Sequence, residues 1–390
     1  MTLTCDDYCD CAQEKRMQIQ TLYLVRKERC FRTLLVFIFC WACLLAEVSH
    51  AKTSPSSKKE SINNRICFVS DMNGSYGSID MPPSVQSAMD QLGRLNCGLV
   101  LGAGDLVAGQ QTSLTESRLR EMWEGFSRVV LAPLDNQNIP FLSALGNHDA
   151  SADRNSSGEF IFERDRRVAK DFWLTRLENS EYPFDWISRE DFPFYYSLRH
   201  GTIGIIVVDG TSSTELRRKR EWLEQQLILF EKDPSLSTRI VVGHLPLVAV
   251  AKGRDRQGEI LADSRSLYEL FDHYKVDLYV SGHHHAFYPG RIDAWSQQHG
   301  TVQLALGALG DGPRHLLGDS NLPARNALSF VDINPSIPFL LGKISLGTLI
   351  PQTGIYLSTL ELPEEIPSVD GRENSVRLER VDFARPFPNP

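Results

Sequence analysis

Apolar residues in the first half of the chain alternate between short unbroken runs and stretches at helical spacing. The runs Ile66–Ser70, Leu99–Ala103 and Ile139–Ala144 have the length of buried strands. A helix is expected between the first two, behind Ser84 as a plausible N-cap, and another around residues 122–130. Strand, helix, strand, helix, strand is the order typical of a parallel α/β sheet.

The second half continues this alternation after an irregular stretch. Residues 150–200 are rich in charge and aromatic side chains, which predicts an elaborated loop with one helix near Val168–Leu177. Tyr195–Leu198 and Ile203–Val208 are expected to form a hairpin-like pair. Helices and strands then alternate over residues 216–230, 239–242, 267–274, 276–280 and 302–306. Short strands up to about Val381 are expected to close the chain, which favours two sheets packed face to face with helices outside.

The N-terminus has the pattern of a targeting segment. Basic residues between Arg26 and Arg32 precede an apolar run, Leu34–Ala46, and Ser49-His50-Ala51 supplies small residues for a signal peptidase. The run is shorter than the roughly 20 apolar residues of a spanning helix. We therefore predict a signal peptide over residues 1–51 with an extended n-region, and Met17 as an alternative start.

This segment has consequences for location and domain organisation. Residues 52–63 lack an apolar period and are expected to be a flexible lead-in. Residues 64–390 are expected to form one domain, with the 150–200 insertion and the C-terminal strands inside it. The protein is expected to be exported, either periplasmic or secreted, without a stable membrane span after cleavage. An uncleaved N-terminal anchor is the alternative.

Composition narrows the class of partner. The 390-residue chain is 42% hydrophobic and 23% charged, as is ordinary for a soluble globular protein. Its formal net charge is -8, and its densest basic cluster, Arg217–Arg220, falls on a helical pattern as a solvated face would. Nucleic acid is therefore not supported as a partner, since its phosphates are normally met by clustered positive charge.

Cysteine usage is compatible with export. Six of the eight cysteines precede Ala51, which leaves Cys67 and Cys97 in or beside apolar runs. Free cysteine in such places usually behaves as a small buried hydrophobe. An export compartment would permit a disulfide between the two without requiring one.

Residues able to bind metal ions follow several of the predicted strands. Loops at the carboxyl ends of strands converge at one edge of an α/β sheet. Any one acidic or histidine residue there is most often a turn or cap residue. Five of the ten histidines nevertheless lie in these loops. The candidates at five strand ends are Asp71, Asp105, Asn147 with His148, His244, and His283 with His285.

The order and spacing of these residues resemble the calcineurin-like metallophosphoesterase superfamily, which includes purple acid phosphatases and many bacterial metallophosphoesterases. The resemblance is carried by Asp71-Met72-Asn73, Gly104-Asp105, Gly146-Asn147-His148-Asp149, Gly243-His244 and Gly282-His283-His284-His285. It implies a four-layer α/β/β/α sandwich of two mixed sheets, the metallo-dependent phosphatase fold. It also implies hydrolysis of small phosphate mono- or diesters by attack of a metal-bridging hydroxide.

The resemblance further implies two divalent or trivalent metal ions, such as Mn, Fe or Zn. One ion would be held by Asp71, Asp105 and His285, and the other by Asp105, Asn147, His244 and His283. A carboxylate shared by two cations lowers their mutual repulsion, which suits Asp105 as the bridge.

Two neighbouring residues are expected to act on the substrate rather than on the metals. His148 is expected to face the phosphate, where it would stabilise the transition state or protonate the leaving oxygen. Asp149 is expected to orient the His148 imidazole. His284 is interpreted as a bystander rather than a ligand.

One residue departs from the family pattern. The family usually has a histidine two residues after the first aspartate, and here that residue is Asn73. An amide oxygen binds hard cations but is a poorer ligand than imidazole for softer metals. The first metal site is therefore expected to be weaker, or to prefer Mn, Fe or Mg over Zn. An alternative is a catalytically weakened, metal-stabilised binding protein on the same fold, against which His148 argues.

Overall fold

The computed structural model describes residues 63–291, 295, 299–310, 312 and 314–316, together with four C-terminal strands. The predicted signal peptide and the lead-in up to residue 62 lie outside the described residues. Within the described part, no helix combines the length and apolar character needed to cross a membrane.

The first sheet contains the strands that precede three of the candidate loops. Among the described residues it has seven strands, in the order β12-β13-β11-β1-β2-β3 with β14 beside β13. The central strands β1, β2 and β3 are parallel, and β11 pairs antiparallel with β1. Their bounds are β1 Arg65–Val69, β2 Leu99–Ala103, β3 Phe141–Ala144, β11 Ala327–Asp332, β12 Thr348–Ile350, β13 Ile355–Glu361 and β14 Leu378–Glu379.

The second sheet contains the strands that precede the remaining two loops. Its order within the described residues is β4-β5-β6-β7-β8-β10-β9, with β6, β7, β8 and β10 parallel. Strands β4, β5 and β9 run antiparallel to their neighbours, and β5 and β6 form the expected hairpin. The bounds are β4 Asp185–Asp191, β5 Tyr195–His200, β6 Ile203–Val207, β7 Thr238–Val242, β8 Leu278–Ser281, β9 Tyr288–Arg291 and β10 Val302–Ala305.

Strand β4 was not expected from the sequence, which suggested only a loop and a helix between residue 150 and the strand that begins at Tyr195. Its sequence, DWISRED, is largely polar, and every one of its residues is partly or fully exposed. It pairs with β5 through an irregular register at the edge of the sheet. An edge strand with little buried surface has no strong alternation of apolar residues, so the pattern did not reveal it.

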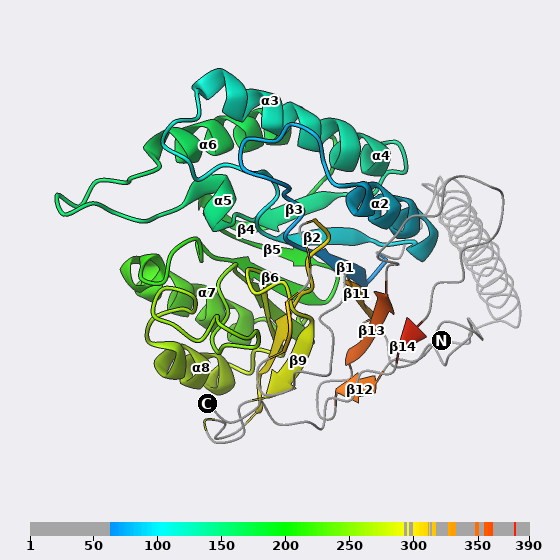
Figure 1. Ribbon diagram of the computed structural model, residues 1–390. Coiled ribbons are helices and arrows are strands. Elements are labelled where there is room, and N and C mark those ends of the chain that lie inside the picture. The colour runs from blue at the N-terminus through cyan, green and yellow to red at the C-terminus, as the bar shows by residue number, and fades with distance from the viewer. Residues whose placement is uncertain are drawn as a thin grey trace, which may run out of the picture. The chain divides into compact units, whose positions relative to one another are not determined.

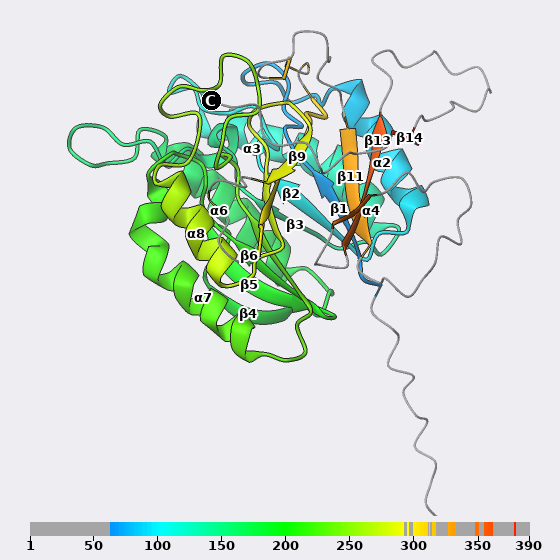
Figure 2. The ribbon, with the colours of Figure 1, turned by 90° about the horizontal axis from the view of Figure 1, so that it is seen from below.

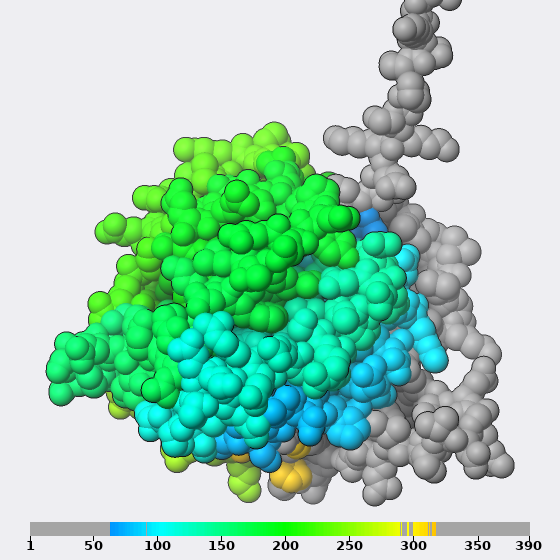
Figure 3. All heavy atoms as spheres, turned by 90° about the horizontal axis from the view of Figure 1, so that it is seen from above, coloured from blue at the N-terminus to red at the C-terminus, as the bar shows by residue number. Residues whose placement is uncertain are grey.

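The helices fall into two groups (Figures 1 and 2). Helices α2, α3, α4 and α6 lie beside the first sheet, whereas α7 and α8 lie beside the second. The space-filling view from above shows a face made largely by the cyan and green segments that include α3 and α6 (Figure 3). The bounds are α2 Pro83–Leu95, α3 Glu116–Phe126, a π-helical segment Ser127–Leu131, α4 Ala132–Asp135, α5 Asn147–Ala150, α6 Glu163–Glu178, a 3-10 segment Glu215–Lys219, α7 Arg220–Lys232 and α8 Ser264–His273.

The starts of helices α2 and α7 differ in how far they follow the expectations from the sequence. Helix α2 begins at Pro83 with Pro82 as its N-cap residue, so the expectation that Ser84 caps it is wrong. The Ser84 hydroxyl instead donates a hydrogen bond to the Leu309 carbonyl. The basic cluster before α7 does lie on a surface, where Arg217 pairs with Asp263.

Side chains that alternate between the two faces of the second sheet contribute to two different hydrophobic clusters. Val242 on β7 and Val280 on β8 belong to the same hydrophobic cluster as Ile66 on β1. Their chain neighbours Val241 and Tyr279 pack instead in the cluster that includes residues of α7 and α8. Because successive side chains of a strand point to opposite faces, this sheet is buried on both. The structure is thus an α/β fold of two mixed sheets, as predicted.

A disulfide links the two cysteines that follow the predicted cleavage site. Cys67 on β1 and Cys97 just after α2 are both buried, with Cα atoms 5.9 Å apart. Of the two alternatives that the sequence left open for these cysteines, buried free thiols or a disulfide, the structure has the disulfide. It ties the first strand to the end of the first helix, across 30 residues of chain.

Reduction of this disulfide should destabilise the protein. Opening a cross-link of this loop length increases the entropy of the unfolded chain, so we expect the free energy of unfolding to fall by about 2–4 kcal/mol. Urea denaturation of oxidised and reduced wild-type protein measures the difference. Alkylation of both cysteines in unfolded, never-reduced protein would contradict the assignment.

Candidate metal centre

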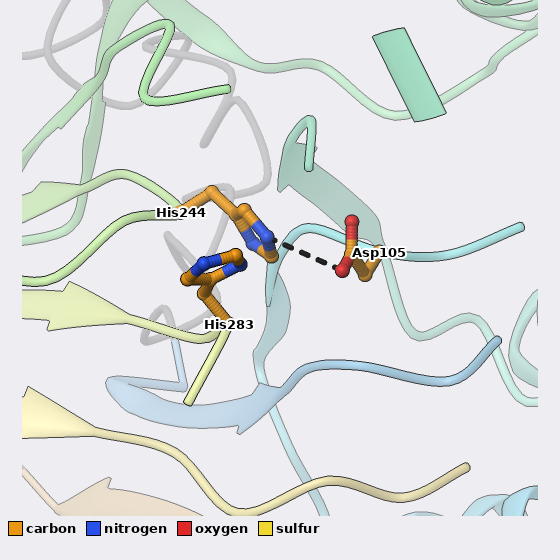
Figure 4. A group of neighbouring side chains, drawn as sticks. All are labelled: Asp105, His244 and His283. Atoms are coloured by element: carbon orange, nitrogen blue, oxygen red, sulfur yellow. Dashed lines mark ion pairs between the residues drawn. The ribbon is translucent and has the colours of Figure 1, made fainter. Parts of the chain in front are cut away.

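Side chains from three strand-end loops converge at the carboxyl edge of the two sheets. Asp105 follows β2, His244 follows β7 and His283 follows β8, and the three point toward one another (Figure 4). Each of the three side chains offers one possible ligand atom, and these three atoms all lie within 4.8 Å of one another. All three side chains are buried. A carboxylate and two imidazoles at this spacing have the chemistry of a divalent metal site.

The backbone at the candidate ligands adopts an unusual conformation. Asp71, Asp105, His283 and His285 have φ angles of 50°, 54°, 67° and 49°, in the left-handed region. They are four of the nine non-glycine residues with positive φ in the described part of the chain. Such conformations cost on the order of 1–3 kcal/mol each and tend to gather at functional sites. Here they turn each loop sharply after its strand.

Glycines allow these loops to pack against one another. A Cβ atom on Gly146 would lie 2.1 Å from Asp105 Oδ1, which no side chain can occupy. Gly104 has a φ of 91°, and a Cβ there would lie 2.6 Å from His244 Nδ1. The glycines before Asp105 and Asn147 are thus explained by the close approach of the loops, and Gly104 also by its positive φ.

Asp105 lies at the centre of the group. Its Oδ2 is 3.3 Å from His244 Nε2, and its Oδ1 accepts the backbone N–H of His148 at 2.9 Å. Burial would raise the pKa of Asp105, but the imidazoles of His244 and His148 together hold that pKa far below its ordinary value. The carboxylate is therefore ionised and available to a cation.

The contacts of His244 leave one nitrogen directed at the centre. Its Nδ1–H donates to the Ala103 carbonyl at 2.7 Å, so Nε2 faces Asn147 Oδ1 at 2.9 Å. The Asn147 amide donates to Gln110 Oε1 at 2.7 Å, which turns its own oxygen toward His244. In neutral His244 both facing atoms carry lone pairs, so they need a proton or a metal ion between them.

The pKa of His244 follows from the same arrangement. Burial lowers it, but the neighbouring Asp105 carboxylate outweighs burial and raises the pKa of His244 to about 9. The raised pKa means that a proton occupies the space between His244 Nε2 and Asn147 Oδ1. A metal ion could take the place of that proton, because both atoms carry lone pairs and the Asp105 carboxylate lies beside them.

His283, the other candidate nitrogen ligand, has a partner that no motif had indicated. His283 Nε2 lies 2.9 Å from Glu259 Oε2, and Glu259 also forms an ion pair with Arg254. The hydrogen bond from His283 and the contact with Arg254 lower the pKa of Glu259 to about 2 despite its partial burial. An ionised carboxylate only accepts, so His283 Nε2 carries the hydrogen and Nδ1 keeps a free lone pair.

The remaining predicted ligands lie next to this group. The Asp71 carboxylate accepts the backbone N–H of His283 at 2.9 and 3.1 Å, and its Oδ1 is 3.4 Å from His285 Nε2. The backbone N–H of Asn73 donates to the Asp105 carbonyl at 3.1 Å. The buried Asn73 Oδ1 has no hydrogen-bond partner among the described residues. A buried oxygen left without such a partner is available to bind a cation.

His148 and Asp149 do not interact as expected. Asp149 Oδ1 accepts the backbone N–H groups of Leu106 and Val107 at 2.8 and 2.9 Å, and Oδ2 accepts that of Gly146 at 2.8 Å. The expectation that Asp149 orients His148 is therefore wrong, since its oxygens are committed to these amides. Burial and nearby Asp105 raise the pKa of Asp149 to about 7, although the three amides favour its ionised form.

His148 instead faces a cavity. The cavity has a volume of about 340 Å³, and its lining includes Asp105, Asn147, His283 and His285. The exposed ring of Tyr76 also lines it, 5.0 Å from the His148 ring between centroids. The His148 Nδ1 atom is buried without a partner in the described part of the molecule. The group of candidate metal ligands is thus open to a small molecule on the side of His148.

His284 is fully buried rather than solvated. Its Nδ1 accepts the backbone N–H of Val250 at 3.2 Å, and its Nε2–H donates to the Glu259 carbonyl at 3.0 Å. Burial lowers the pKa of His284 to about 3, so the ring is neutral. With both nitrogens engaged it is no ligand in this arrangement; it supports the loop that carries Glu259.

Comparison with known proteins places this site in context. Residues 64–287, more than half of the chain, match the family model described as calcineurin-like phosphoesterase. No curated protein gives a significant match.

Similar solved structures include the purple acid phosphatase PPD1 from yellow lupin (Lupinus luteus) seeds. It is 16% identical with a TM-score of 0.49, and the match covers 69% of this chain but 49% of the lupin chain. PhoD is 10% identical with a TM-score of 0.48, over 68% of this chain and 63% of its own. GAP50, the anchor in the inner membrane complex of Plasmodium, is 12% identical with a TM-score of 0.45, and the match covers 83% of this chain and 89% of the GAP50 chain.

Replacement of Asp149 by alanine should destabilise the fold rather than act on a single reaction step. Three backbone amides would lose their hydrogen-bond acceptor, and each buried N–H left without one lowers the free energy of unfolding by about 1–3 kcal/mol. We expect the free energy of unfolding in urea to fall by at least about 3 kcal/mol. Asp153→Ala, at an exposed carboxylate nearby, should leave it unchanged. Equal stability of Asp149→Ala and wild type would contradict the role assigned to these hydrogen bonds.

Proposed function

The chain belongs to the calcineurin-like phosphoesterase family, and on that premise we propose that it hydrolyses small phosphate mono- or diesters with metal ions held at its strand-end loops. The observation that carries the proposal is the pairing of His244 Nε2 with Asn147 Oδ1 beside ionised Asp105, at the wall of an open cavity. This arrangement combines a cation site with access for a small substrate.

Two metal ions, of Mn, Fe or Zn, are proposed. Asp105, Asn147, His244 and His283 hold one, and Asp71 and His285 with Asp105 hold the other, to which Asn73 contributes its amide oxygen. When bound, such ions polarise a phosphate group and make a water-derived nucleophile available near neutral pH. The unpartnered Asn73 oxygen supports its inclusion. An amide in place of imidazole there favours a harder cation in the site that contains Asp71 and His285.

His148 is proposed to act on the substrate. Its ring lines the cavity, and its Nε2 is 3.9 Å from Asp105 Oδ2, close enough to reach a phosphate placed at the centre. There it hydrogen-bonds a phosphate oxygen or protonates the leaving oxygen. Asp149 contributes by fixing the backbone of the two loops that carry Asp105 and His148.

The alternative of a catalytically weakened binding protein rests on Asn73 alone. The family match and a histidine facing the cavity without a partner for Nδ1 both favour the hydrolase. A binding protein stabilised by metal would have no need of an imidazole at that place.

Export to a periplasmic or secreted location is proposed as well. The Cys67–Cys97 disulfide supports it, because such bonds persist mainly in oxidising compartments. The predicted signal peptide over residues 1–51 is the segment that would direct it.

Turnover should depend on bound metal. The purified protein is expected to hydrolyse 4-nitrophenyl phosphate or bis(4-nitrophenyl) phosphate, to lose this activity on chelation and to regain it with Mn²⁺, Fe²⁺ or Zn²⁺, because the ions supply the nucleophile. Release of 4-nitrophenol measures the reaction. Absence of turnover with both substrates, while metal is bound, would refute the hydrolase.

His148→Ala should separate catalysis from metal binding. We expect kcat to fall by about 10²–10⁴-fold, the usual contribution of a proton-transferring side chain, with unchanged metal content by elemental analysis. His273→Ala, at an exposed histidine of α8, is the matched control and should retain full activity. Loss of metal from the His148 variant would mean that this residue is a ligand instead.

A further inference from the structure

Glu259 reaches the metal centre from a loop outside every recognised motif. We propose that Glu259 is a positioning residue that holds the His283 ring so that its Nδ1 faces the metal ion. The inference rests on the proposed metal site and adds to it a residue from the 246–262 loop, the segment between β7 and α8.

The contact itself determines the state of the imidazole. Glu259 Oε2 lies 2.9 Å from His283 Nε2, and a carboxylate can only accept in that contact. Arg254 Nη1 is farther from the same nitrogen, at 3.5 Å, and is engaged with Glu259. His283 is thus held in the tautomer whose Nδ1 lone pair is free. A carboxylate behind a ligand histidine fixes its orientation and makes it a stronger donor.

Glu259 is itself held from two sides. Its carboxylate pairs with Arg254, and its backbone carbonyl accepts the Nε2–H of His284 at 3.0 Å. The consecutive residues His283 and His284 therefore bind the side chain and the backbone of the same glutamate. This gives the buried His284 a role, although it is no ligand in this arrangement.

The 246–262 loop is anchored independently of Glu259. The buried Gln303 accepts the N–H groups of Leu247 and Val248 at 2.7 and 3.0 Å and donates to the Val248 carbonyl at 3.1 Å. The loop is closed by the N–H of Leu261, which donates to the Pro246 carbonyl at 2.9 Å. Because the loop is tied to β10 in this way, Glu259 is placed before any ion binds, which lowers the cost of ordering His283.

An ordinary surface ion pair offers a comparison. The Glu259 side chain is 17% exposed and contacts His283, whereas Glu269 on α8 is 37% exposed and forms an ion pair with Arg265 of the same helix. An exposed ion pair such as Glu269–Arg265 contributes little to the stability of a protein. Glu269 is therefore a matched control for substitution of a paired glutamate.

Cobalt binding tests the proposal without relying on turnover. Co²⁺ affinity is measured by competition with a chromogenic chelator, and its visible absorption reports the ligand geometry. Glu259→Ala is expected to weaken Co²⁺ binding about 10–100-fold and to alter the absorption spectrum. Glu259→Gln keeps an acceptor for Nε2–H and should lose less, and Glu269→Ala should match wild type. Wild-type affinity and spectrum in Glu259→Ala would overturn the proposal.

A double-mutant cycle with His283→Ala shows whether Glu259 acts through that ring. In the His283→Ala background, Glu259→Ala should cause no further loss of affinity, since the contact is already gone. An equal loss in both backgrounds would mean that Glu259 acts elsewhere, and would overturn the proposal. Absence of Co²⁺ binding by the wild type would refute the metal site and this inference together. Wild-type Co²⁺ binding without phosphoester turnover would instead refute only the hydrolase.

Discussion

The buried Asp105 carboxylate is the group around which the site is arranged. An ionised carboxylate is stable in a protein interior only if it is hydrogen-bonded and faces positive charge. Here a backbone amide of His148 and the His244 imidazole supply both. To bring them close enough, the loops adopt left-handed turns and approach each other where glycine leaves space. Asp149 then holds two of these loops together through three backbone amides.

Much of this architecture could be predicted from the sequence because buried parallel strands have a strong pattern. Uninterrupted apolar runs marked β1, β2, β3, β7 and β8 closely, and each is followed by the residues able to bind metal. Carboxyl ends of neighbouring parallel strands meet at one edge, so residues far apart in sequence were expected together. The proximity of Asp105, His244 and His283 follows from that geometry.

The remaining features depend on individual side-chain contacts, which leave no periodic pattern in the sequence. Asp149 was expected to contact its neighbour His148, whereas its carboxylate binds amides of a loop more than forty residues away. Nothing in the 246–262 loop distinguishes Glu259 from other charged residues before the fold places it against His283. The same holds for the disulfide, since spacing alone does not decide whether two buried cysteines meet. Such side-chain contacts are determined by three-dimensional packing rather than by local pattern.

Every function proposed for this site depends on where metal ions bind. A crystal grown with Mn²⁺ or Zn²⁺, with anomalous scattering measured on both sides of the metal absorption edge, locates the ions directly. We predict one anomalous peak among Asp105, Asn147, His244 and His283, and a neighbouring peak beside Asp71 and His285. Anomalous peaks confined to other parts of the molecule, in crystals of protein that hydrolyses phosphate esters, would contradict it.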